Sequence, residues 1–524
     1  MTTNQTPKSI TLTLPPVALY AAEGILLALI LLLAGYLRLT NVAENPGWYT
    51  DETTHIDIAN HRLAGETQYM LIKDSTLMFG RLPLFHILLA SYFQLSGNPD
   101  HMLALRTFTA LLGVLSVALL YAAVRRSGGT TLALLAAFVL AIYPQAVLYN
   151  RFGFSYNLLP PLILLAVLAL DRYLANGRLI WLALGALALG IGLVAEVWIL
   201  ALIIPFVIIA ARRPRHVLWS VPLLFVPFAI YAILMLISSS IAFLFDLSFT
   251  ISRLIPTTPL NEQWTTLFNN YQTLIGSSVW ILAGIIGLFA LQPSRLRWIA
   301  VLFFVTPIVF IGRTNALYNL SAYYMIPLLP FIALGIAALV RYGAGALIVS
   351  GRENLPPITG LNSGLAIGIT TVTVLFFAGS LLIASVPATI TAVQSGYSTD
   401  IDSFLINPTD AKQVAAFINS QVTPNDVIVA SPVVGWQFGG HPEDFQMAVA
   451  AADHVATPHL PANIPPERLA FNPDYHQARF VVIDNLWRNW GVIFIPGLSD
   501  VVNDVQTNWR QVYQLGQFTV YERS

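Results

Sequence analysis

An acidic pair, Asp51-Glu52, followed by His55, is the part of the sequence best suited to proton chemistry. Thr50 is placed to cap a short helix, so both acids fall in its first turn and Asp51 shares a helix face with His55. A carboxylate on that face could act as a general base, and the face could also contact a substrate or a metal ion. The acids could equally serve only to complement the helix dipole.

Two polar segments further along the chain carry side chains that could bind a phosphate group. Arg81 stands just before an apolar run that contains His86, and Arg151 is followed by Tyr156 and Asn157. Guanidinium groups make bidentate contacts with phosphate oxygens, although Arg81 could also reach lipid headgroups. We treat His86, Tyr156 and Asn157, like His55, as possible substrate or metal contacts. A single histidine in a helix is nevertheless more often a structural hydrogen-bonding residue.

The composition indicates an integral membrane protein. Of the 524 residues, 56% are hydrophobic and only 10% are charged, whereas a soluble domain carries about 25% charged residues. Lys+Arg and Asp+Glu both number 26, a balance that argues against a nucleic-acid partner and leaves the lipid bilayer as the expected one. The absence of cysteine excludes disulfides, cysteine-ligated zinc and thiol catalysis.

The apolar segments predict an all-α polytopic membrane domain, residues 1–394, with about eleven transmembrane helices. The run from Pro83 to Leu95 is only about 13 residues long, so we expect an interfacial helix there rather than a span. Glu196 interrupts a long apolar stretch, which we interpret as a hairpin, with a single tilted helix as the alternative. The predicted spans are residues 17–38, 103–124, 130–149, 157–174, 179–195, 197–211, 216–238, 278–292, 297–312, 320–341 and 363–388.

The charges of the short loops predict which side of the membrane each loop occupies. With eleven spans, the basic loops all fall on the side of the N-terminus, which the positive-inside rule makes cytoplasmic. The first loop, residues 39–102, then lies outside the plasma membrane, and so does the C-terminal region. The Trp48-Tyr49 pair suits a position at headgroup level. Arg313 is a basic residue on the side that otherwise has few, and is therefore a further candidate ligand for an anion.

From residue 395 to 524 the pattern changes to that of a soluble, extracytoplasmic α/β domain. Residues 411–418 read as a helix, and residues 426–430, 480–484 and 518–521 read as short buried strands. No glycine-rich phosphate loop follows these strands, so nucleotide binding there is not expected. The long loop at residues 239–277 is amphipathic and could cover a cavity.

The order of these features resembles that of the GT-C membrane glycosyltransferases, in particular the protein O-mannosyltransferase and aminoarabinose-transferase branch. The resemblance covers roughly residues 17–345. It depends on four motifs, each weak alone but in the family's order and on the expected sides of the membrane. They are Asp51-Glu52, Arg81-Leu82-Pro83-Leu84, Asn150-Arg151 and Tyr324-Met325-Ile326-Pro327.

The resemblance implies an inverting transferase that uses a polyprenyl-phosphate-linked sugar outside the membrane, with a protein, lipid or glycan as acceptor. Asp51 matches the family's general base and Glu52 its neighbour, Arg81 and Tyr324 match positions that face the donor phosphate, and Arg151 matches the arginine of the family's second outward motif. We expect Arg151 and Arg313 to bind the donor phosphate as well. Many members carry an acid shortly after the arginine that matches Arg151, where this chain has Ser155, Tyr156 and Asn157. A divalent metal is possible, but that second carboxylate is missing. No other cofactor is implied.

Two other classes of function remain open from the sequence. One is a non-catalytic scaffold or assembly subunit built on the same fold, which the missing acid and the large C-terminal region permit. The other is a transporter of lipid-linked precursors, which should carry charges in the middle of several spans. Such charges are nearly absent here, so the transporter ranks last.

Overall fold

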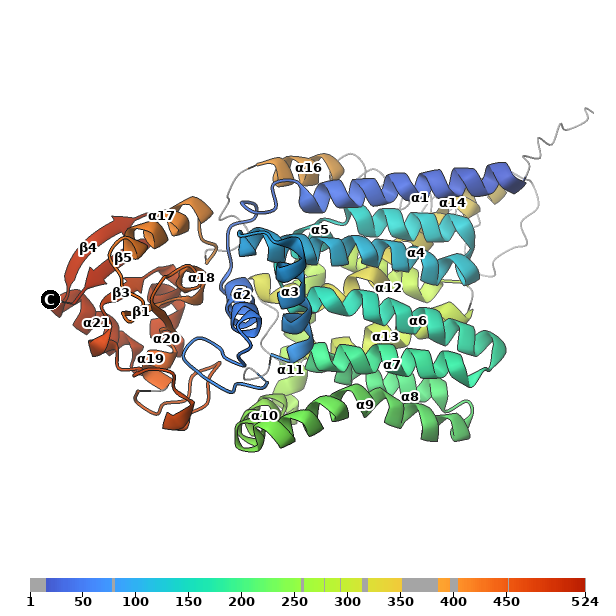
Figure 1. The fold of residues 1–524 in the computed structure, drawn as a ribbon. Helices are drawn as coiled ribbons and strands as arrows, with labels where there is room; N and C mark the ends of the chain where they lie inside the picture. Colours follow the sequence, from blue (N-terminus) through green and yellow to red (C-terminus); the bar gives the residue numbers. More distant parts are fainter. Residues whose placement is uncertain are drawn as a thin grey trace, which may run out of the picture.

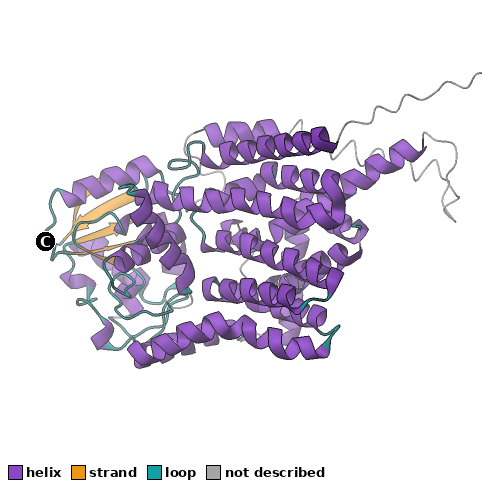
Figure 2. Cartoon of the chain, turned by 45° about the vertical axis from the view of Figure 1, so that its right-hand side comes forward, coloured by secondary structure: helices purple, strands orange, loops and turns teal. Residues whose placement is uncertain are grey.

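The computed structural model combines a bundle of roughly parallel helices with a smaller part that contains a β-sheet (Figure 1). It describes residues 16–77, 81–255, 259–277, 279–292, 294–312, 319–350, 385–395, 404–450 and 452–523. The strands gather in the C-terminal part, at one end of the bundle (Figure 2). The predicted combination of a helical membrane domain with a C-terminal α/β region is therefore what the described residues form.

The helices of the bundle follow the apolar segments of the sequence. They are α1 (Pro16–Leu39), α4 (His101–Ile142), α5 (Pro144–Asn150), α6 (Leu159–Asn176), α7 (Leu179–Ala195), α8 (Ile203–Ala210), α9 (Pro214–Ser238), α12 (Val279–Ala290), α13 (Ser294–Gly312), α14 (Leu329–Ser350) and α16 (Val386–Gln394). Three 3₁₀ segments join them, η2 (Ser155–Leu158), η3 (Val197–Leu202) and η4 (Asn319–Leu328).

The α4 element is a helical hairpin rather than one straight helix. Gly129 has φ 79°, a left-handed conformation that glycine adopts without steric cost, and it breaks the helix. Before the break, Arg125 pairs with Glu23 near the start of α1, and after it the carbonyl of Ala141 accepts from Arg38 at the end of α1. The chain thus runs along α1 and returns, in agreement with two separate predicted segments, 103–124 and 130–149.

Five helices are long and apolar enough to cross a membrane by length and composition, within the part of the chain that is described. They are Val17–Leu39, His101–Ile142, Ser155–Asn176, Pro214–Ser238 and Tyr323–Tyr342. The helices α7 and α8 are shorter, and the chain between them breaks at Glu196, which excludes a single helix through that stretch. Most of the eleventh predicted span, 363–388, lies outside the described residues, so the number of spans stays a prediction.

Short helices lie across one end of the bundle. α2 (Thr50–Leu63) and α3 (Pro83–Ser96) stand between the bundle and the C-terminal part (Figure 1). Pro83 occupies the first turn of α3, where its missing N–H costs nothing, and Gly97 ends the helix with φ 59°. The short helix predicted at Pro83–Leu95 is therefore present. α10 (Ser240–Leu254) and α11 (Leu260–Ser277) occupy the predicted loop 239–277.

The C-terminal part is built on a five-stranded sheet with strand order β2-β1-β3-β5-β4. β1 (Val427–Ala430), β3 (Phe480–Ile483) and β5 (Phe518–Glu522) are the three strands that the sequence predicts. It misses β2 (His441–Asp444) and β4 (Arg510–Leu515), which are mixed in polarity and lie at the two edges of the sheet. Its helices are α17 (Pro408–Asn419), α18 (Pro432–Gly435), α19 (Met447–Ala450), α20 (Val492–Phe494) and α21 (Leu498–Asn508).

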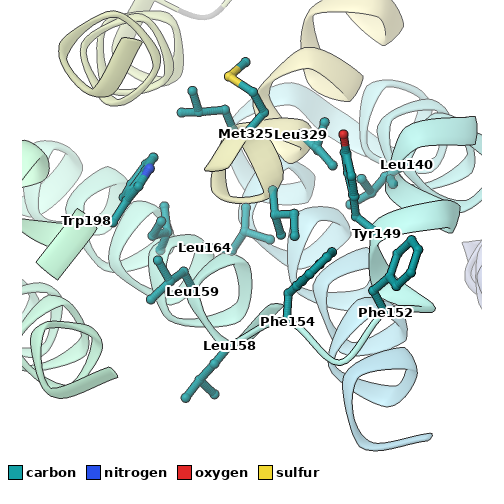
Figure 3. Packing of buried hydrophobic residues seen from close by; sticks show 14 of the residues in the cluster. Leu140, Tyr149, Phe152, Phe154, Leu158, Leu159, Leu164, Trp198, Met325 and Leu329 are labelled. Carbon is teal, nitrogen blue, oxygen red and sulfur yellow. The ribbon is translucent and has the colours of Figure 1, made fainter. Parts of the chain in front are cut away.

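A continuous apolar core holds η2, η3 and η4 together at the end of the bundle that faces the C-terminal part. Figure 3 shows four members of one buried cluster: Phe154 directly before η2, Trp198 in η3, Met325 in η4 and Leu329 at the start of α14. The Trp198 indole N–H donates to the carbonyl of Tyr324 at 3.2 Å. The backbone that carries the predicted tyrosine motif is thus fixed against its neighbours.

Candidate functional site

Glu52 is a buried structural carboxylate. Its two oxygens accept from Arg106 Nε and Nη2 at 2.8 and 2.6 Å, and the Gly153 amide donates to Oε1 at 2.7 Å. Oε2 also accepts from the Tyr49 amide, so Tyr49 is the N-cap of α2 and the prediction that Thr50 caps the helix is wrong. Glycine at 153 is needed because a Cβ there would collide with Leu105. Glu52 therefore joins α2, α4 and the loop before η2.

Asp51 has different surroundings from its neighbour. Its Oδ1 accepts from Arg81 Nη2 at 3.0 Å, and both side chains stay about a quarter exposed, at 26% and 24%. Burial lowers the pKa of the Arg81 guanidinium, but Asp51 and nearby Tyr69 raise it by more, so the group stays protonated. An accessible carboxylate beside an accessible guanidinium can contact both a hydroxyl group and a phosphate.

Three tyrosines pack together beside this ion pair. The ring of Tyr156 lies 5.3 Å from Tyr323 and 5.1 Å from Tyr324, and the last two lie 4.6 Å apart. Asp51 lies within electrostatic range of all three hydroxyl groups. The structure thus brings together four predicted site residues, Asp51, Arg81, Tyr156 and Tyr324, from four different segments.

Glu196 adds a second carboxyl group that the sequence reasoning did not assign to the site. It is 5% exposed, and the Ser155 hydroxyl donates to its Oε1. Burial raises the pKa of Glu196 to about 7, against opposing effects of the Ser155 hydrogen bond and Arg81, while Asp51 raises it further. Ser155 occupies the region in which the second acid is missing from the sequence, so a carboxyl from another part of the chain lies beside that segment.

The two predicted histidines form a neutral pair. His86 Nδ1 lies 3.1 Å from the Leu82 carbonyl and therefore carries the proton, and its Nε2 accepts from His55 Nδ1 at 2.8 Å. Burial lowers the pKa of His86 to about 3 and that of His55 well below its usual value. This pair ties α2 to α3 and so supports the position of Asp51 one turn before His55.

Arg151 and Asn157 are enclosed in the protein. Arg151 is 1% exposed and donates to four backbone carbonyls, those of residues 37, 40, 41 and 45. Asn157 is 1% exposed, accepts from Asn150, and donates to the carbonyls of Tyr149 and Phe152. These contacts assign both side chains to the closure of loops, so neither enters our proposals as a substrate ligand. Arg313 lies outside the described residues.

The C-terminal part contributes side chains to the same end of the bundle. The Tyr69 hydroxyl donates to Asp444 at 3.4 Å, and Arg81 lies within electrostatic range of Asp444. Burial raises the pKa of Asp444 to about 7. Burial and the Arg253 guanidinium lower the pKa of His459 to about 4, although Asp51 acts in the opposite direction. Asp444 and His459 had no motif to reveal them.

The attachment of the C-terminal part uses both backbone and side chains. Trp48 and Ile406 exchange two backbone hydrogen bonds of 2.9 and 3.0 Å. Arg468 binds the buried Asp246 of α10, with Nη1 2.7 Å from Oδ1. Among the described residues, no group of three or more His, Asp or Glu is arranged to hold a metal ion.

One family model and several solved structures match this chain. The model, described as dolichyl-phosphate-mannose-protein mannosyltransferase, matches residues 81–243. No curated protein sequence matches. The structure of ArnT from Cupriavidus metallidurans bound to undecaprenyl phosphate superposes with a TM-score of 0.58 at 14% identity, over 96% of this chain and 98% of ArnT. Apo ArnT gives a TM-score of 0.62 at 13% identity, with the same coverage.

An archaeal protein shares the fold over a similar part of the chain. The oligosaccharyltransferase AglB from Archaeoglobus fulgidus, solved with an inhibitory peptide and a dolichol-phosphate, gives a TM-score of 0.54 at 11% identity. The match covers 96% of this chain and 74% of AglB. The resemblance to the GT-C glycosyltransferases that the motifs indicate is thus confirmed, and the described chain has their fold.

Proposed function

Since the chain has the GT-C fold, we propose that it transfers a sugar from a polyprenyl-phosphate-linked donor to a hydroxyl group of a protein, lipid or glycan acceptor. The Asp51–Arg81 ion pair carries this proposal. A phosphate that arrives at the site can take the guanidinium from Asp51, since arginine binds phosphate and carboxylate through the same donors. The carboxylate is then released from its partner beside the donor.

Asp51 is the proposed general base. In the reaction, the acceptor oxygen bonds to the anomeric carbon as the bond from that carbon to the phosphate oxygen breaks. The acceptor proton passes to Asp51, and the polyprenyl phosphate leaves with the bonding electrons. Arg81 stabilises the charge on the departing phosphate, with Tyr324 as a neighbouring hydroxyl. Direct displacement inverts the anomeric centre.

The position of the ion pair in the bundle supports chemistry at a membrane surface. Basic loop residues such as Arg125, Arg213 and Arg341 lie at the opposite end, where Arg213 donates to the Gly177 carbonyl and Arg341 to that of Gly128. We propose that the basic end is cytoplasmic and that Asp51 faces the extracytoplasmic side. The C-terminal part would then stand in the cell envelope and select the acceptor. ArnT was solved with undecaprenyl phosphate and AglB with a dolichol-phosphate, which supports this class of donor.

The test uses the full-length protein in lipid nanodiscs with a panel of polyprenyl-phosphate-linked sugars. Release of free polyprenyl phosphate in the presence of an acceptor hydroxyl would support a transferase. The anomeric configuration of the glycosylated acceptor, compared with that of the donor, would test inversion. Asp51→Asn should abolish release. Failure of the wild-type protein to consume any donor in the panel, together with loss of a partner complex on deletion of residues 395–524, would favour the scaffold function instead.

A further inference from the structure

We propose that Glu196, in its neutral form, donates a hydrogen bond to the donor phosphate held at Arg81. The inference deepens the proposed function and rests on it, because it assumes that a polyprenyl phosphate binds beside Arg81. Glu196 would then be a phosphate ligand with a role distinct from that of Asp51. One carboxyl group accepts a proton from the acceptor, and the other supplies a hydrogen bond to the leaving group.

The backbone holds Glu196 at a fixed point of the site. It stands between α7 and η3 with φ −152° and ψ 136°, an extended residue between two helical segments. Ser155, which begins η2, donates to Oε1. Two residues further on, Trp198 binds the carbonyl of Tyr324 at 3.2 Å. Glu196 is thereby tied to the two segments that carry Tyr156 and Tyr324.

The charged and titratable groups around Glu196 come from four segments. Asp51 belongs to α2, Arg81 precedes α3, Tyr156 lies in η2 and Tyr324 in η4, and each interacts electrostatically with Glu196. Of these, only Arg81 is a cation, and Asp51 already binds it at 3.0 Å. Within the described residues, the Ser155 hydrogen bond to Glu196 uses Oε1, so Oε2 keeps its capacity to bind a ligand.

The protonation state follows from this arrangement. Burial raises the pKa of Glu196 to about 7 in the free protein. A phosphate anion at Arg81 adds negative charge nearby and raises the pKa again, so the bound state favours the protonated carboxyl. By linkage, phosphate binding is strong at a pH below the pKa that Glu196 has in the free protein, and it weakens as the pH rises through that pKa. An ionised Glu196 would instead repel the phosphate.

Asp444 is the group that could be mistaken for Glu196 in such an experiment. Its pKa is also raised to about 7 by burial, and it too lies within electrostatic range of Arg81. It differs in its partners, since Tyr69 and the Gln446 amide donate to it. Asp444→Asn is therefore the matched control for Glu196→Gln.

The experiment measures the affinity of the full-length protein in nanodiscs for undecaprenyl phosphate between roughly pH 5.5 and 9, a range that covers the ionisation of Glu196. For the wild type we expect the affinity to fall by up to about tenfold for each pH unit above the pKa of Glu196. Glu196→Gln keeps a neutral hydrogen-bond donor, so this variant should bind undecaprenyl phosphate well. Its affinity should no longer show the part of the fall with pH that comes from ionisation of Glu196. Glu196→Ala should bind weakly at every pH, and Asp444→Asn should keep the wild-type profile.

Ser155→Ala gives an independent check that leaves the carboxyl in place. The Ser155 hydrogen bond lowers the pKa of Glu196, so its removal should move the fall in affinity to higher pH. Ionisation of the phosphate itself contributes equally in all variants and cancels in the comparison. Identical profiles for the wild type, Glu196→Gln and Ser155→Ala would overturn the inference and leave the proposed function intact. No binding by the wild type at any pH would refute both.

Discussion

Arg106 donates to both carboxylate oxygens of Glu52 in a contact from which water is excluded. Asp51, the residue directly before Glu52, pairs with Arg81 in an accessible position. Both side chains of the first pair are 0% exposed, and those of the second are about a quarter exposed. Two adjacent acids on one helix therefore have separate tasks. Glu52 fixes the start of α2, and that fixed start presents Asp51 to the site.

Asp51→Asn should abolish sugar transfer with little effect on folding. The amide keeps the size of the side chain but cannot take a proton, and loss of general-base catalysis typically costs about 10²–10⁴-fold in rate. Release of polyprenyl phosphate in single-turnover assays measures the effect. Glu66→Gln, an exposed acid after α2 in the same loop, is the matched control and should behave like the wild type. Transfer by Asp51→Asn at near the wild-type rate would remove Asp51 from the mechanism.

Glu52→Gln should destabilise the protein instead. Removal of one partner leaves the Arg106 charge buried and unpaired, which costs about 3–5 kcal/mol. Thermal unfolding in detergent should show a clearly lower midpoint. The comparison is Glu23→Gln at the other end of the bundle, where the partner Arg125 is 36% exposed and we expect a loss of about 0–1 kcal/mol. Equal midpoints for the two variants would contradict a structural role for Glu52.

Arg81→Gln should reduce affinity for undecaprenyl phosphate while the fold persists. Loss of a charged hydrogen bond costs about 1.5–3 kcal/mol, which corresponds to a dissociation constant that is roughly tenfold to hundredfold larger. Arg178→Ala, an exposed arginine between α6 and α7, controls for a general loss of positive charge. Binding can be measured by titration in nanodiscs, and unchanged affinity would exclude Arg81 as the phosphate ligand.

Arg151→Gln should lower the stability of the protein without changing its phosphate affinity, the reverse of the pattern expected for Arg81→Gln. Its guanidinium binds four backbone carbonyls at the end of α1, and unsatisfied buried groups cost about 1–3 kcal/mol each. We therefore expect a lower unfolding temperature and unchanged phosphate affinity per folded molecule. Normal stability with weak binding would restore Arg151 to the phosphate-binding role that its motif implies.

Arg468→Met should loosen the C-terminal part from the bundle. Arg468 is 5% exposed and binds the fully buried Asp246 of α10, so the change leaves a buried carboxylate without its partner. Hydrogen exchange should increase on both sides of this contact, and transfer should decrease because the C-terminal part, which we propose selects the acceptor, loses its position on the bundle. Arg479→Met is the control, since Arg479 pairs with Asp426 within the C-terminal part and is 34% exposed. Faster exchange in the control alone would contradict this attachment.

The sequence was informative where one local signal suffices. The length of the Pro83 run predicts the short helix α3, and the hydrophobic runs predict β1, β3 and β5. It was least informative for the edge strands β2 and β4, whose mixed polarity follows from their place in the sheet. The sequence also predicts the same phosphate-binding role for Arg151 and Arg81. Residue type does not show that backbone carbonyls enclose the Arg151 guanidinium while that of Arg81 is accessible.

A physical signal for Glu196 existed in the sequence. An acid between two apolar helices is costly unless it has a partner or a function, yet the sequence pattern around Glu196 predicts only a turn. The family pattern expects the missing acid close to Ser155 in the chain, whereas the structure supplies a carboxyl from 41 residues away through a hydrogen bond with Ser155. Spacing along the chain cannot reveal such a contact.

By itself, the sequence determined the membrane character of the chain, the helical segments, and the candidates Asp51, Arg81 and Tyr324, because hydrophobicity and residue chemistry are local properties. The tertiary structure alone decided which of two adjacent acids is accessible, which arginine is structural, and which distant carboxyl and histidine lie beside the ion pair. Those properties depend on burial and on partners far apart in the chain, and only packing brings such partners together.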